Sequence, residues 1–267
     1  MNDRITKLSL GAIWDETAKF VRAEFALLLP VAFLGFGLPL LIAMMAMPVE
    51  AAKTGTLAPG PWMLWMLPGL PLAMIGFVAV SALALRPGAT VRDCLGVAIA
   101  RLPAAFGLFG LYMAMQVLLA LPLAAISLIE RQLTGAIGPV SMVGNLASLA
   151  ITIWVFVRLL PVWAVLSDRS IGPWGAVKAA FAMTRGHYVK LLLLSVVGPC
   201  AALLLFLVVL VPLGAITAMI AMLSGAQRVS EILSFVGTAA VFAMLAAIWT
   251  VYVARLSVWL SGSISGT

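Results

Sequence analysis

The chain has 267 residues, of which 64% are hydrophobic and only 9% are charged, and its formal net charge is +7. A soluble domain carries about 25% charged residues, so this composition excludes a fold whose surface is covered by water. The composition indicates instead a protein that is embedded in a lipid bilayer. The excess of positive charge then favours anionic lipid headgroups as partners, and we expect no nucleic-acid partner.

Six apolar stretches are long enough to cross a bilayer, because a spanning helix needs about 20 mostly apolar residues. In chain order they are residues 25–47, 62–85, 104–128, 140–164, 191–222 and 232–253. We therefore predict an all-α polytopic protein with six transmembrane helices, which form one integral membrane domain over residues 1–267.

The basic residues are distributed unequally between the two ends of these spans. Thirteen of the sixteen lie at one end, and only Lys53, Arg131 and Arg228 lie at the other. Six of the nine acidic residues lie at the same end as the thirteen basic residues, so all of the net positive charge lies at that end. Basic flanks are retained in the cytoplasm, which predicts that this end and both termini are cytoplasmic.

Each longer cytoplasmic segment is predicted to form an interfacial amphipathic helix that leads into an odd-numbered span. The first covers about residues 9–23. The second begins at Thr90, and Asp93 three positions later matches a variant of the capping box. The third follows Gly172-Pro173, since proline suits the first helical position. The apolar stripes are Ile13, Thr17, Phe20 and Val21, then Val91, Cys94, Leu95, Ala98 and Leu102, then Trp174, Val177, Phe181 and Tyr188.

An interfacial helix followed by two spans recurs three times, which predicts a threefold internal repeat with units at about 9–85, 90–166 and 172–260. Two even-numbered spans end alike, because Arg158-Leu159 and Arg255-Leu256 are each followed closely by a Val-Trp pair.

The segments 158–166 and 176–188 combine an arginine within a span, a proline, a polar break and an amphipathic helix that ends in Thr-Arg-Gly. With the opening stretch 20–25 followed by Pro30, they resemble a bacterial family named for the membrane domain of glycerophosphoryl diester phosphodiesterases, together with related six-span proteins. The resemblance implies a bacterial inner membrane. Relatives often have an acid soon after the proline, whereas here the first acid is Asp168. These 267 residues include no phosphodiesterase domain, so the family name implies no enzymatic activity.

The residue types needed for catalysis are scarce. His187 is the only histidine and no group of carboxylates accompanies it, whereas hydrolysis usually needs a metal-held water or a paired acid and base. Cys94 and Cys200 stand too far apart in the sequence to suggest a zinc or disulfide motif. We predict no catalytic residue, no metal site, no cofactor and no enzyme, since only His187, Arg158 and Asp168 remain as catalytic candidates.

The candidates for lipid headgroup binding are Arg92, Arg101, Arg158, Lys178, Arg185 and His187. An arginine at the centre of a span costs about 2.5–3.5 kcal/mol, so Arg158 is expected either to bind a lipid phosphate or to extend its side chain to the interface. His187 is expected to be a pH-sensitive headgroup contact or a polar ring at the interface. Gln116 and Asn145 are expected to bond neighbouring helices.

Two functions follow from these patterns. The first is a non-catalytic membrane protein that binds or organises anionic lipid or serves as a membrane-embedded partner of other proteins. The alternative is a transporter or channel for a small or lipidic solute, which the repeats and the many prolines in the spans would suit. A polar midplane cavity lined by Gln116, Asn145 or Arg158 would favour the alternative, and a closed apolar bundle would favour the first.

Overall fold

The computed structural model describes residues 10–47, 60–86, 88–136, 138–225 and 227–264. All regular secondary structure in these residues is helical, which confirms the predicted all-α class. Six helical segments are long and apolar enough to cross a membrane, as expected.

The first pair of spans begins after helix α1 (Leu10–Ala23). The outgoing span consists of α2 (Phe25–Ala32), a π-helical turn η1 (Phe33–Gly37) and α3 (Leu38–Ala46), and the returning span consists of η2 (Pro61–Met66) and α5 (Gly69–Leu85). Within η1 the backbone N–H of Leu38 donates to the Phe33 carbonyl five residues earlier. Pro39 has no N–H to offer the Gly35 carbonyl, which explains why the α-helical pattern is interrupted here.

The next two pairs are longer. The second consists of α6 (Val91–Thr134), α7 (Pro139–Leu159) and α8 (Val162–Asp168), and the third consists of α9 (Pro173–Met183), α10 (Tyr188–Ser224) and α11 (Gln227–Ile264). Helix α6 runs unbroken through Pro103, so the predicted interfacial helix and the third span are one helix. The fourth predicted span is instead divided by a turn at Leu160 and Pro161.

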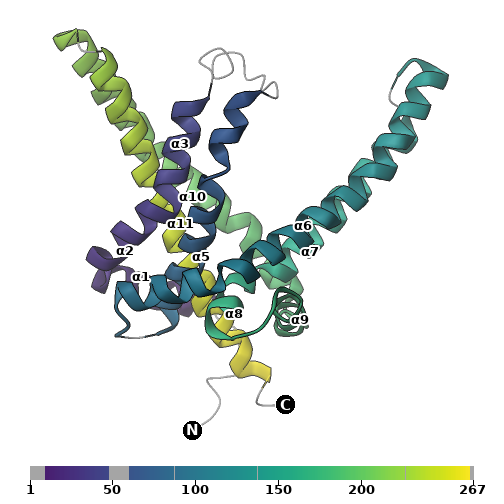
Figure 1. Cartoon of the computed structure of the whole chain (residues 1–267), viewed down its shortest axis with the longest axis horizontal. Coiled ribbons are helices and arrows are strands. Elements are labelled where there is room, and N and C mark those ends of the chain that lie inside the picture. The colour runs from purple at the N-terminus through teal and green to yellow at the C-terminus, as the bar shows by residue number, and fades with distance from the viewer. Residues whose placement is uncertain (1–9, 48–59, 87, 137, 226, 265–267) are drawn as a thin grey trace.

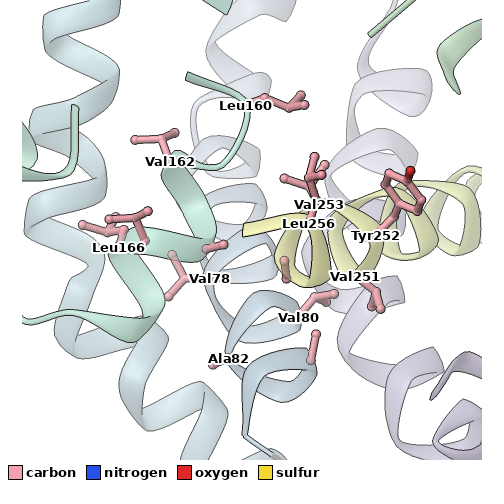
Figure 2. Packing of buried hydrophobic residues seen from close by; sticks show 14 of the residues in the cluster. Val78, Val80, Ala82, Leu160, Val162, Leu166, Val251, Tyr252, Val253 and Leu256 are labelled. Atoms are coloured by element: carbon pink, nitrogen blue, oxygen red, sulfur yellow. The ribbon is translucent and has the colours of Figure 1, made fainter. Parts of the chain in front are cut away.

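The long hairpins α6–α7 and α10–α11 diverge from a common region and carry their turns at the far end (Figure 1). Helices α1, α8 and α9, the first turns of α6 and the last turns of α11 lie at the opposite end, here called the basal end. The core lies toward this end, where Val78 of α5, Leu166 of α8 and Leu256 of α11 pack together (Figure 2).

The outer halves of the two long hairpins are apolar and uncovered. The most apolar part of α6 contains no buried residue, and Leu118 in this helix is 72% exposed. Val211 of α10 is 69% exposed. Exposed apolar surface on this scale is unfavourable in water, so hydrocarbon is the medium that accommodates these helices.

Two predicted helix starts are confirmed. At α6 the Asp93 carboxylate accepts from the Thr90 backbone N–H at 3.2 Å, and the Thr90 hydroxyl accepts from the Asp93 N–H at 3.2 Å, which completes a capping box. Helix α9 begins with Pro173 at its first position. Both starts follow from local chemistry, which explains why they could be read from the sequence.

Trp174, a member of the apolar stripe predicted for α9, is 59% exposed. The buried residues of this helix are Ala176, Ala180 and Met183. Small alanine side chains allow α9 to lie close to α8, and this close packing determines which face is covered. The Trp174 ring instead lies 5.7 Å from the Lys178 ammonium.

Candidate functional site

Positive charge is concentrated at the basal end of the molecule. It carries all six residues that the sequence proposed for headgroup binding, whereas Arg131 and Arg228 lie beside the distant turns. The elements involved are the first turns of α6, the end of α7, all of α9 and the start of α10. The site is therefore described around Arg158, where three of these elements meet.

Two local turns bring the α9–α10 connection to Arg158. Arg158 itself lies in the last turn of α7, just before the chain turns at Leu160 and Pro161. Helix α9 ends at Met183 with Thr184 as its C-cap, and Gly186 adopts a φ of +85°, a left-handed conformation that glycine tolerates without strain. The chain can therefore reverse within a few residues and start α10 at Tyr188.

The Arg158 guanidinium lies between two aromatic rings and near two oxygens. Its central carbon is 5.7 Å from the ring centroids of both Trp154 and Tyr188. One terminal nitrogen donates to the Phe181 carbonyl at 3.5 Å and to the Thr184 hydroxyl at 3.4 Å. Both hydrogen bonds are long, and Nε is buried without any partner.

No carboxylate among the described residues forms an ion pair with Arg158. The oxygens that it reaches are a neutral carbonyl and a neutral hydroxyl, and its aromatic neighbours supply only the weaker cation–π attraction. The guanidinium therefore has a positive charge, a fixed position and unused N–H groups. Such a group can bind a carboxylate or phosphate oxygen.

Three predicted residues lie on α9 and on the α9–α10 connection. Lys178 and Arg185 are exposed and form no ion pair with the described part of the chain. His187 is half-buried, and its Nδ1 atom is buried without a hydrogen-bond partner. The structure thus brings Arg158, Lys178, Arg185 and His187 into one region, whereas the sequence placed them up to 29 positions apart.

The other two predicted residues lie on α6. Arg101 is half-buried on the first part of this helix, and Arg92 is exposed at its start. Arg92 lines a cavity of about 570 Å³ together with Arg86 and Arg255. Arg86 and Arg255 were not among the predicted headgroup residues, because they are far apart in the sequence. The Arg-Leu pair that occurs at both Arg158 and Arg255 was a signal for Arg255.

Of the two polar residues within the spans, Gln116 forms the predicted bond to a neighbouring helix, whereas Asn145 forms no such bond in the described structure. The Gln116 amide donates to the Tyr112 hydroxyl at 2.9 Å, and its carbonyl accepts from the Thr152 hydroxyl of α7 at 3.3 Å. Asn145 is exposed on α7. None of the three cavities described in the structure is lined by Gln116, Asn145 or Arg158.

Within the described ranges, no group of three or more His, Cys, Asp or Glu side chains is arranged to hold a metal ion. Comparison with known proteins found no matching family model, curated protein or solved structure. The geometry of the basal end is therefore the basis for a functional assignment, and the family resemblance stays a prediction.

Proposed function

We propose that this chain is a non-catalytic integral membrane protein of a bacterial inner membrane that binds anionic phospholipid through its basal end. In this proposal the basal end faces the cytoplasm, and both termini are cytoplasmic. The observation that carries the proposal is the Arg158 guanidinium, which is held by neutral groups and lacks an anionic partner in the described structure.

The energetic argument starts from desolvation. A positively charged side chain near hydrocarbon is stable when it reaches water, lipid phosphate or a counter-ion. Arg158 is half-buried and bonded only to neutral oxygens, so its charge is not balanced within the described structure. A phosphate oxygen would supply both the hydrogen bonds and the charge, and hydrogen bonds to charged groups contribute about 1.5–3 kcal/mol.

The surroundings of Arg158 suit a lipid headgroup. Lys178 of α9 and Arg185 of the α9–α10 connection are exposed and add positive charge without nearby acids bonded to them. A basic residue close to an anionic membrane surface contributes about 1 kcal/mol to binding. Trp154 and Tyr188, which flank Arg158, are residue types that favour the boundary between hydrocarbon and water.

The transporter alternative gains less support. Gln116 is engaged between two helices, and the described cavities do not include the polar residues that a midplane site would use. A protein partner at the basal end is compatible with lipid binding, but no contact in the structure identifies such a partner.

The test is lipid retention by the full chain in nanodiscs that contain equal amounts of phosphatidylglycerol and phosphatidylcholine. Native mass spectrometry of the released protein should show bound phosphatidylglycerol in excess. Arg158→Gln should reduce that excess several-fold, and Arg158→Lys should restore only part of it, because lysine lacks the planar fork of donors. Arg131→Gln, at the distant turn, is the matched control with the same charge change. Equal retention of both lipids by the wild-type protein would refute the proposal.

A further inference from the structure

A second cationic site lies about the start of α6, separate from Arg158. The cavity there has a volume of about 570 Å³ and is lined by residues from α1, α2, α5, the connection to α6, α6 itself and α11. Its charged residues are Arg86, Arg92, Arg255 and Glu24. Three arginines and a single carboxylate residue thus line one cavity.

Two of the three arginines are held in place by the protein. The Arg255 guanidinium carbon lies 5.2 Å from the ring centroid of Phe20, and its Nε is buried without a partner. One terminal nitrogen of Arg86 donates to the Ser167 carbonyl at 3.1 Å. These contacts orient both side chains before any ligand arrives, which lowers the entropy lost on binding.

The carboxylate does not neutralise this cluster. Glu24 forms no ion pair with Arg86, Arg92 or Arg255, and neither Arg92 nor Arg255 is bonded to an acid elsewhere in the described residues. The cavity therefore retains an excess of positive charge. Arginine donors match phosphate oxygens in geometry and can bind them in pairs, so a phosphate group is the anion that fits this cluster.

The remaining lining decides between a soluble phosphate and a lipid. Phe20, Leu27 and Leu83 bring apolar surface into the same cavity. Leu27 belongs to α2, the first part of a membrane span, so the cavity adjoins the region that hydrocarbon surrounds. A ligand with a phosphate at one end and apolar chains at the other satisfies both surfaces.

We propose that this cavity is a separate binding site for an anionic phospholipid, with the phosphate on Arg86, Arg92 and Arg255 and the glycerol and upper acyl chain against Leu27 and Leu83. This inference rests on the proposed function, because it assigns a further headgroup site on the same basal end. It also places a ligand in contact with α1, α6 and α11, which belong to distant parts of the chain.

Photo-crosslinking of the full chain tests the site. Nanodiscs would contain phosphatidylglycerol with a diazirine on the upper part of one acyl chain, and mass spectrometry would locate the adducts. Adducts are expected near Leu27 and Leu83, and excess unlabelled phosphatidylglycerol should suppress them while phosphatidylcholine should not. Arg92→Glu should reduce them about fivefold or more, because it reverses one charge that has no bond to the described part of the chain. Arg131→Glu, at the distant end of the same helix, is the matched control with the same charge reversal.

The outcomes separate this inference from the broader function. Wild-type protein that retains phosphatidylglycerol but gives no adducts near these leucines would overturn the cavity site alone. Suppression of the adducts by sodium phosphate or glycerol phosphate, without suppression by the anionic lipid, would assign the cavity to a soluble anion and also overturn it. Arg255→Lys provides a second variant that keeps the charge, and its adduct yield should fall while thermal unfolding stays close to that of the wild type.

Discussion

The Arg255 guanidinium lies 5.2 Å from the ring centroid of Phe20, and this contact joins the last span to the first described helix. At the other end of α1 the Tyr252 hydroxyl donates to the Leu10 carbonyl at 3.3 Å. Helix α11 thus holds α1 at two points through side chains one turn apart. The attachment of α1 can be tested separately from lipid binding.

Phe20→Leu should loosen the second half of α1. The substitution keeps an apolar side chain but removes the ring, and a cation–π contact contributes about 0.5–1 kcal/mol at an exposed site. Hydrogen exchange in α1 should therefore accelerate about two- to fivefold. Phe106→Leu, at an exposed site on α6, is the control. Unchanged exchange in α1 would show that this contact does not hold the helix.

Gly35→Ala should destabilise the first pair of spans. An added Cβ would lie 2.3 Å from the Gly76 Cα, so two backbones that touch would have to separate. Overpacking of this kind costs about 1–3 kcal/mol or more. Thermal unfolding in detergent, followed by tryptophan fluorescence, should show a clear decrease in Tm. Gly110→Ala meets no atom within 4 Å and should leave Tm unchanged or raise it, and equal effects of the two would be evidence against the close packing.

Glu130→Gln should weaken the turn between α6 and α7. The carboxylate accepts hydrogen bonds from the backbone N–H groups of Gly138, Val140 and Ser141, each at 3.0 Å, at the start of α7. The neutral amide loses the charge that favours a helix N-terminus and can accept with only one oxygen. Faster hydrogen exchange over the first turn of α7 is expected. The control is Glu231→Gln, beside the turn between α10 and α11, which should leave hydrogen exchange over the first turn of α7 unchanged.

Cysteine labelling tests the orientation. Arg92→Cys and Arg185→Cys should react with a membrane-impermeant maleimide on the same face of sealed vesicles, and Gln227→Cys should react only on the opposite face. The reason is that the first two lie at the basal end and the third at a distant turn. Background from Cys200, which is exposed on α10, is removed by Cys200→Ser. Labelling of Arg92→Cys and Arg185→Cys on different faces would contradict the fold.

The parts of the fold that follow from local chemistry could be predicted from sequence. Hydropathy over about 20 residues indicates a span regardless of its neighbours, and the capping pair Thr90 and Asp93 needs only a separation of three positions. The break at Pro161 and the unbroken course through Pro103 were not predictable in this way. Both are prolines in apolar sequence, and tertiary packing decides whether the helix continues.

The candidate site was predicted in part for the same reason. Arg158 was recognised because a charge within an apolar run is costly wherever it lies. The cluster of Arg86, Arg92 and Arg255 could not be predicted, since its members come from three segments that meet only in the folded chain. The exposure of Trp174 likewise depends on the alanines that α9 buries against its neighbours.

The relative affinity of the protein for anionic and zwitterionic lipid tests the central claim most directly. Electron paramagnetic resonance of spin-labelled phosphatidylglycerol and phosphatidylcholine measures it in a common host bilayer. One unpaired arginine near the surface contributes about 1 kcal/mol, so the wild-type protein should favour phosphatidylglycerol about fivefold or more, and the preference should fall with added salt. Equal association of the two lipids at low ionic strength would contradict the account.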